Sequence, residues 1–340
     1  MYKIRKLDEQ AIENAEKKWN SIAKPLHSLG VFEEIIKNIA GIQGTQNIDI
    51  KKRCVLVMCA DNGVVCEGVT QTGQEVTAVV TENFAKGATS VCTMARNIGA
   101  DVVPIDVGVA RDVDGVVNKK ISYGTKNMLH EKAMTYEQAK EAVQVGIDCV
   151  KELSEKGYKI IVTGEMGIGN TSSSSLWMTC FTGIPLDQCV GAGSGLNHQG
   201  INHKYEVLKR SLEQYPGEHS AEEILCRFGG YEMVMAVGAM LKAAELGMVI
   251  LIDGFIMTNC ILAASRLYPE VMSYAIFGHQ GDESGHKLLL DYLGARPLLN
   301  LGLRLGEGSG SVCAYPIVDS AVKMLNEMDS FAHASITKYF

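Results

Sequence analysis

Continuous apolar runs of strand length recur along the chain. The clearest runs lie at 54–59, 102–105, 160–162 and 249–252, and a weaker one lies at 274–277. Such runs are typical of strands that are buried on both faces of a sheet. Amphipathic patterns of helical period separate them, at 89–98, 135–156, 171–181, 231–246, 257–267 and 283–293. This alternation predicts an α/β fold with an open, mostly parallel sheet and helices on both faces.

The two ends of the chain carry helical patterns without strands. Asp8 is a suitable N-cap for a first helix, and a second helix follows Gly30. The apolar stripe of the first helix is spaced by three and four residues and comprises Ile12, Ala15, Trp19 and Ile22. A last helix at 312–329 is expected to return to this helical unit. Residues 110–130 have the least pattern, and we expect a surface excursion or a short hairpin there.

Composition narrows the class of protein. The chain has 340 residues, 46% of them hydrophobic and 21% charged, which fits one large domain with or without a small accessory unit. A formal net charge of −7 is unlike that of a general nucleic-acid binder. The longest apolar stretch, 233–264, is interrupted by charges and glycines, so no membrane span is expected. Ten cysteines without a CxxC pair indicate reduced thiols and a cytoplasmic protein.

Polar, glycine-containing loops follow the predicted strands. In an open parallel sheet, ligands bind outside the carboxyl ends of the strands, so these loops are expected to converge. Two of them carry a single acid each, Glu165 within 164–172 and Glu307 within 302–311. The remaining loops are 60–64, 191–195, which follows a supposed strand ending at Val190, and the dipeptide Asp253-Gly254.

Three of these features are candidates for anion binding. The segment 191–195 could present backbone amides to a phosphate, and Asn170 begins a helix whose free amides attract anions. Lys204 could reach the same anion. An ordinary tight loop, simple helix capping and a solvated lysine are the alternative explanations of the three features. The GxGxxG and GxxxxGK[ST] fingerprints are absent, so neither a dinucleotide-binding site nor a P-loop is expected. HExxH spacing and a GxSxG elbow are also absent, so neither a metal site nor Ser-His-Asp chemistry is expected.

Six motifs together resemble the nicotinate-nucleotide–dimethylbenzimidazole phosphoribosyltransferase family. They are Lys24-Pro25 with Ser28-Leu29-Gly30, Ala60-Asp61-Asn62-Gly63-Val64, Gly164-Glu165-Met166-Gly167-Ile168-Gly169-Asn170-Thr171, Gly229-Gly230-Tyr231-Glu232, Asp253-Gly254-Phe255 and Leu303-Arg304-Leu305-Gly306-Glu307-Gly308. They occur in the family's order and span nearly the whole chain. The resemblance implies transfer of phosphoribosyl from nicotinate mononucleotide to a benzimidazole-type base, with release of nicotinate. It also implies a homodimer, no cofactor and no metal.

The resemblance further implies a division of the chain and a set of site residues. A Rossmann-like catalytic domain would span 46–311, and a small helical domain would combine 1–45 with 312–340. Glu307 is expected to act as general base and Glu165 to stabilise charge near the ribose. The expected substrate-binding residues are Gly167, Asn170, Thr171, Ser172, Gly191, Gly193, Ser194, Lys204, Asp253, Thr72, Leu305 and Gly306.

The chain departs from the family's pattern at several of these motifs. Asn62 stands where the family usually has histidine, and Ala192 stands where it often has arginine. Asn197 and His198 replace acids, and the base-facing segment 69–74, which includes Thr72, also differs. Benzimidazole, a methylated form, adenine and a phenol therefore remain open as the accepted base. An N-glycosidase and a non-enzymatic nucleotide-binding regulator are the competing functions.

Overall fold

A single six-stranded sheet forms the centre of the computed structural model, which describes residues 2–338. Every pair of neighbouring strands is parallel, and the order across the sheet is β3-β2-β1-β4-β5-β6. The strands are β1 (Arg53–Ala60), β2 (Asp101–Gly108), β3 (Val117–Asn118), β4 (Ile160–Met166), β5 (Val249–Ile252) and β6 (Ala275–Phe277). This is the order of a doubly wound sheet, whose topological switch point lies between β1 and β4.

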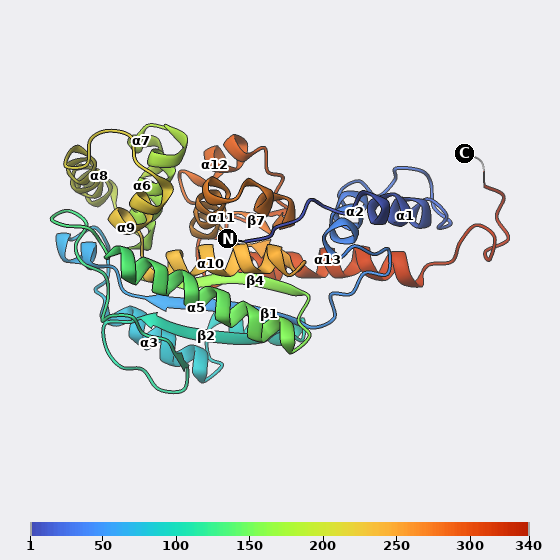
Figure 1. Ribbon diagram of the computed structural model, residues 1–340, viewed down its shortest axis with the longest axis horizontal. Coiled ribbons are helices and arrows are strands. Elements are labelled where there is room, and N and C mark those ends of the chain that lie inside the picture. Colours follow the sequence, from blue (N-terminus) through green and yellow to red (C-terminus); the bar gives the residue numbers. More distant parts are fainter. Residues whose placement is uncertain (1, 339–340) are drawn as a thin grey trace.

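The central strands are buried on both faces, as their apolar runs predict. All side chains of β1 from Cys54 to Ala60 and all of β5 are buried. Helices cover the two faces of the sheet (Figure 1). One face carries α5 (Tyr136–Glu155), α10 (Tyr231–Glu245) and α11 (Phe255–Leu267), and the other carries α3 (Glu75–Ala85), α4 (Ser90–Asn97) and α13 (Ser309–Glu327). The predicted fold class is confirmed.

A group of helices is inserted between β4 and α10 and lies beyond the carboxyl ends of the strands (Figure 1). It consists of α6 (Asn170–Thr182), α7 (Leu186–Cys189), α8 (His198–Glu213) and α9 (Ala221–Phe228). The expectation of a strand before Val190 was wrong, because the preceding residues form the short helix α7. An apolar run of only a few residues does not distinguish a strand from a turn of buried helix.

Short elements complete the chain around the sheet. After β6 come β7 (His279–Gln280), α12 (His286–Leu293) and β8 (Leu299–Asn300), and β7 pairs with β8 in parallel. Two short 3-10 helices are η1 (Gly63–Glu67), which follows β1, and η2 (Pro269–Tyr274), which precedes β6.

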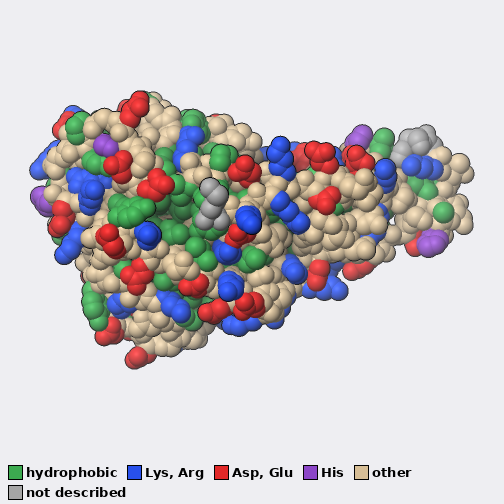
Figure 2. All heavy atoms as spheres, viewed as in Figure 1, with side chains coloured by type: hydrophobic (Ala, Val, Ile, Leu, Met, Phe, Trp, Pro, Cys, Tyr) green, Lys and Arg blue, Asp and Glu red, His purple; other side chains and the backbone are tan. Residues whose placement is uncertain are grey.

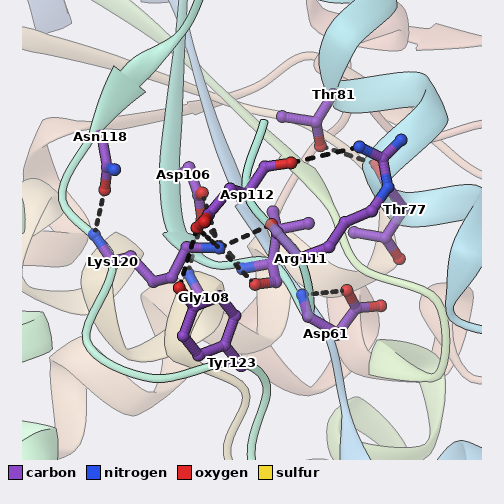
Figure 3. A network of polar contacts seen from close by, with 12 residues as sticks. Asp61, Thr77, Thr81, Asp106, Gly108, Arg111, Asp112, Asn118, Lys120 and Tyr123 are labelled. Carbon is purple, nitrogen blue, oxygen red and sulfur yellow. Dashed lines mark hydrogen bonds and ion pairs between the residues drawn. The ribbon is translucent and has the colours of Figure 1, made fainter. Parts of the chain in front are cut away.

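The weakly patterned segment after β2 is an excursion that adds an edge strand. β3 pairs with β2 in parallel, so the alternative of a hairpin was wrong. Figure 3 shows the polar network that holds this excursion. Lys120 forms a buried ion pair with Asp106 at 3.1 Å and donates to the carbonyl oxygens of Val109 (2.6 Å) and Arg111 (2.7 Å). Interactions between charged and polar groups are strong where water is excluded. This buried polar network therefore holds the excursion, which has no periodic apolar side chains to pack.

The two ends of the chain meet at one end of the molecule. Helices α1 (Glu9–Trp19) and α2 (Val31–Gln43) lie beside the last part of α13 (Figure 1). An antiparallel bridge between Ile22 and Ser330 ties the two termini together. Helix α13 is continuous across the boundary predicted at 311/312, and the division into two domains stays a prediction.

The surface offers no single-sign patch on the face drawn in Figure 2, where acidic and basic side chains are interspersed. Within residues 2–338, no helix has the length and apolar character needed to cross a membrane.

Helices α5 and α10 approach each other backbone to backbone at two glycines. A Cβ on Gly146 would collide with the carbonyl oxygen of Met235 and lie 2.7 Å from the amide nitrogen of Ala239. A Cβ on Gly238 would likewise collide with the carbonyl oxygen of Val143. The packing of this layer on the sheet therefore depends on the absence of side chains at these two positions.

We expect Gly146→Ala to lower the free energy of unfolding by about 1–3 kcal/mol, because overpacking outweighs alanine's better helix propensity. Urea unfolding measures the change. Lys151→Ala, at an exposed position of the same helix, is the control and should change it by less than about 0.5 kcal/mol. Equal stability of Gly146→Ala and the native protein would contradict the close approach.

Candidate active site

A cleft opens at the carboxyl ends of β4 and β5, beside the topological switch point of the sheet. Its space is about 850 Å³ including the open mouth. Nine of the residues predicted from the sequence line it. They are Glu165, Gly167, Asn170, Thr171, Gly193, Ser194, Asp253, Leu305 and Gly306. The convergence of loops that are distant in sequence follows from the parallel sheet.

Five predicted residues are not part of the cleft wall. Ser172 is fully buried in the first turn of α6, and Thr72 is exposed while its neighbours Val69 and Thr70 line the cleft. Gly191 lies behind the wall, where its carbonyl oxygen is 3.5 Å from the Lys204 Nζ atom. The side chains of Lys204 and Glu307 are described below.

The polar end of the cleft is built from the N-terminus of α6. Gly169 has φ of 95°, ends the glycine loop and provides no side-chain cap for α6. The amide of Asn170 donates to the carbonyl oxygen of Gly167 at 3.0 Å and that of Ser172 to the carbonyl oxygen of Gly169 at 2.9 Å, and Asn170 and Thr171 line the cleft at this helix end. Lys204 of α8 is completely buried behind them, and its Nζ atom donates to Thr171 Oγ1 at 2.8 Å. Burial lowers the pKa of Lys204 to about 8. A buried cation beside a helix N-terminus favours a bound anion.

Glu165 is the buried carboxyl group of the cleft wall. It stands near the end of β4, and its Oε2 atom accepts a hydrogen bond from Asn170 Nδ2. Burial raises its pKa, against the hydrogen bond from Asn170, and the nearby carboxylates of Glu232, Asp253 and Glu307 raise it further. A carboxyl group with a pKa raised in this way, at the wall of a cleft, is a candidate for a functional role. A Cβ on residue 306 would collide with Glu165 Oε1, so this position requires Gly306, whose φ is 86°.

Glu307 lies next to the cleft wall, but its carboxylate turns away from the wall. It is a buried non-glycine residue with φ of 63°, between Gly306 and Gly308, and its Oε2 atom accepts from the amide of Val91 at 3.2 Å. Val91 is in the first turn of α4, a place that suits a negative charge. Burial nevertheless raises the pKa of Glu307, against that hydrogen bond, and Asp253 adds to the rise.

Asp253 holds the loop that carries Glu307. Its Oδ2 atom accepts from the amide of Gly308 at 3.2 Å, and its Oδ1 atom accepts from the amide of Ser311 at 2.9 Å. Gly308 is the N-cap residue of α13 and has no side chain, so Asp253 satisfies amides of the first turn from the end of β5. His279, which also lines the cleft, approaches Asp253 Oδ1 with its Nε2 atom at 3.4 Å.

Sequence reasoning did not assign several residues that form or support the wall. His279, Glu283 and Arg304 line the cleft, and Glu232 and Asn62 lie beneath the loop that carries Gly167. Arg304 and Glu232 belong to motifs that were recognised, and Glu232 is conspicuous as an acid at the start of a long apolar segment. His279 and Glu283 carry no periodic signal. Among the described residues, no group of three or more His, Cys, Asp or Glu side chains could hold a metal ion.

The glycine loop that contains Ile168 contacts residues of the polar network drawn in Figure 3. The amide of Ile168, in the cleft wall, donates to Thr77 Oγ1 at 3.1 Å, and Thr77 lies near Asp61 and lowers the pKa of that carboxyl group. Asp61 Oδ2 accepts from the amide of Ala110 at 2.7 Å. The neighbouring residues Thr77 and Asp61 thus hold the loop of the cleft and the excursion after β2, respectively.

Comparisons with known proteins agree over the length of the chain. A family model described as phosphoribosyltransferase, DBI_PRT, matches residues 4–336. A nicotinate-nucleotide–dimethylbenzimidazole phosphoribosyltransferase from Bacteroides fragilis is 52% identical over 342 residues, with 100% of this chain and 99% of the relative covered. One from Parabacteroides distasonis is 54% identical, with 95% and 94% covered. The crystal structure of CobT from Thermus thermophilus is similar with a TM-score of 0.92 at 32% identity, covering 97% of this chain and 100% of that chain.

We expect Lys204→Met to raise the free energy of unfolding at pH 7 by about 1–3 kcal/mol, because it removes a buried charge that no carboxylate neutralises directly. The pKa of Lys204 is lowered in the folded protein, so the protonated lysine destabilises the fold below about pH 8. This cost disappears as the pH rises toward the ordinary lysine value of 10.5.

Urea unfolding at pH 7 and pH 10 measures this effect, and the gain from the substitution should shrink at the higher pH. Lys209→Met, at an exposed position of the same helix, is the matched control and should change little at either pH. A loss of stability in Lys204→Met at pH 7 would mean that the cation stabilises the folded protein.

Proposed function

The chain belongs to the phosphoribosyltransferase family that includes the nicotinate-nucleotide–dimethylbenzimidazole enzymes, and on this premise we propose which of its residues carry the reaction. The protein is a pentosyltransferase. It moves phosphoribosyl from nicotinate mononucleotide to a ring nitrogen of a benzimidazole-type base, a step of cobamide nucleotide assembly. The bond from the ribose C1′ atom to nicotinate breaks, a bond to the base forms, and the base loses its N–H proton.

The chemistry defines what the protein must supply. Nicotinate leaves from a ring nitrogen that is already cationic, so the leaving group needs little activation. The ribose carbon develops positive charge as the bond breaks, as in glycoside hydrolysis. The incoming base is a weak nucleophile until its N–H proton is removed. A negative charge near the ribose and a proton acceptor near the base are therefore the two requirements.

The cleft has a polar end that suits the nucleotide. We assign the phosphate to the N-terminus of α6, where Thr171 and the buried Lys204 lie together. Gly193 and Ser194 line the same end and would contact the phosphate or the ribose. The observation that carries the proposal is this pairing of an anion-binding helix end with the carboxyl group of Glu165 in one wall.

The cleft wall also has apolar side chains that suit an aromatic base. Val69, Met166 and Leu305 are among its lining residues, and Leu305 remains half exposed, free to cover a planar ring. Glu307 follows Leu305 by two residues, so its backbone stands beside the place where the base would lie. An apolar surface next to an acid favours the protonated acid and so supports proton uptake.

In this proposal Glu307 accepts the proton of the base and Glu165 stabilises the charge that develops on the ribose. Glu307 must first release the amide of Val91 and turn toward the cleft, and glycines on both sides of it leave room for that change. Glu165 needs no such movement, because its carboxyl group is already part of the wall. Burial raises the pKa of Glu307, which suits a group that gains a proton during turnover.

We further propose that the protein acts as a homodimer in the cytoplasm. All ten cysteines are free, which fits a reducing compartment. Exposed large apolar side chains such as Tyr292, Leu288 and Tyr123 offer surface for a second copy. Light scattering during gel filtration gives the mass in solution, and a monomer at micromolar concentration would contradict the dimer.

We expect Glu307→Gln to lower turnover by about 10²–10⁴, the usual contribution of a general base, while binding of nicotinate mononucleotide is largely kept. Product formation from nicotinate mononucleotide and dimethylbenzimidazole, followed by mass spectrometry, measures turnover. An unchanged rate would remove Glu307 from the role of base.

The control separates transfer from hydrolysis. Nicotinate release is measured in the native protein with and without the aromatic base. Release only with the base supports transfer, whereas equal release without it would identify an N-glycosidase.

A further inference from the structure

The carboxyl group of Glu232 lies buried directly beneath the cleft. It has no exposed surface and stands in the first turn of α10. Its Oε1 atom accepts a hydrogen bond from Asn62 Nδ2 at 3.1 Å. Its Oε2 atom is buried without a partner, and so is the Oδ1 atom of Asn62. A buried oxygen without a hydrogen-bond partner destabilises the fold, so a pair of them requires an explanation.

The two unpartnered oxygens lie in the same small space, which two glycines leave free. A Cβ on Gly230 would meet Asn62 Oδ1 at 2.7 Å and Glu232 Oε1 at 2.6 Å, and would overlap with Oε2. A Cβ on Gly167 would meet Glu232 Oε1 at 2.5 Å. Two acceptor oxygens cannot bond to each other. One proton on Glu232 Oε2 makes that atom a donor, and a carboxylic acid and a primary amide then pair through two hydrogen bonds.

The charges around Glu232 favour this proton. The acidic groups near it are Asp61 after β1 and Glu165 on β4, whereas burial raises the pKa of the neighbouring Cys59 and Cys260 thiols and keeps them uncharged. No lysine, arginine or histidine of residues 2–338 lies within 4.0 Å of the carboxyl oxygens of Glu232 or Glu165. Burial raises the pKa of Glu232 against the hydrogen bond from Asn62, and the negative charge of Asp61 raises it further.

Asn170 connects this buried pair to the cleft. Its Nδ2 group donates to Glu165 Oε2, and its side chain also lies near Glu232 and lowers the pKa of that group. The two carboxyl groups therefore lie around one amide, and negative charge on either one opposes negative charge on the other. Two such groups release their protons in two steps that belong to the pair.

We propose that Glu232 is a positioning residue that keeps one proton, paired with the amide of Asn62, so that the carboxylate at the cleft is Glu165. This inference rests on the proposed function, because it explains how Glu165 becomes an anion in a buried place without a cation. In the state with one proton, Asn170 directs its donor to Glu165. Removal of the second proton would place two negative charges across Asn170 and disturb the geometry of the wall.

Glu232→Gln reproduces the protonated state, since a glutamine side chain can accept from Asn62 Nδ2 and donate to Asn62 Oδ1. We expect kcat at saturating substrates and neutral pH to remain within about threefold of the native value. In the native protein kcat should fall at alkaline pH as the pair loses its second proton, and in Glu232→Gln this fall should move upward by at least about one pH unit. Saturating nucleotide separates the effect from Lys204, whose deprotonation weakens anion binding and acts on KM.

The proton on Glu232 can be detected by a measurement that does not depend on enzyme activity. Infrared difference spectra between pH 6 and pH 9 should show the C=O stretch of a buried carboxylic acid in the native protein and in Glu165→Gln, and should lack it in Glu232→Gln. Glu245→Gln, the same change on an outer turn of α10 where Glu245 pairs with Lys242, is the matched control and should behave as the native protein does.

Two results would overturn the proposal. One is a loss of kcat by more than about 10² in Glu232→Gln at every pH with the fold intact by circular dichroism, since Glu232 would then be needed as an anion. The other is a protonated-acid band that survives in Glu232→Gln and disappears in Glu165→Gln. Failure of the proposed function is distinguishable, because it would leave the infrared result unchanged and remove phosphoribosyl transfer from the native protein.

Discussion

The site depends on the carboxylate of Asp253, which joins the end of β5 to the first turn of α13. Its hydrogen bonds to the amides of Gly308 and Ser311 fix where that helix begins. The loop before the helix then passes over β4, where the amide of Glu307 donates to the carbonyl oxygen of Glu165 at 3.2 Å. One buried carboxylate thereby brings residues about 140 positions apart to the same wall. Because Gly308 provides no side-chain cap, no local interaction could replace it.

A second constraint is the concentration of acids with few cations around them. Glu165, Glu232, Asp253 and Glu307 are all buried near the carboxyl ends of the strands, whereas the buried Lys204 is bonded to Thr171 and Arg304 lines the cleft. Burial raises the pKa of Glu165, Glu232 and Glu307, so these groups take up protons more readily than exposed carboxylates do. This arrangement costs stability, and it suits a reaction in which positive charge appears on a sugar and a proton leaves a heterocycle.

Much of the architecture could be predicted because local pattern and burial agree in this class of fold. The runs at 54–59 and 249–252 are apolar at every position, and the strands they form are buried on both faces. Where a segment was short or lacked hydrophobic periodicity, the prediction of its secondary structure was wrong. The run before Val190 is a turn of helix, and the excursion after β2 contains a parallel strand that is held by the ion pair of Asp106 and Lys120. Neither the short helix nor this pairing has a periodic signal.

The sequence by itself determined the fold class, the family and most of the cleft, because glycine loops after parallel strands must converge at one edge of the sheet. Only the tertiary structure decided which way the side chains in those loops point. It directs Glu165 into the wall, turns Glu307 toward the amide of Val91 and encloses Glu232 with Asn62 beneath Gly167. The reason is that the partners of these acids come from strands and helices far away in the chain. Hydrogen bonding and burial at such contacts have no periodicity that a sequence can display.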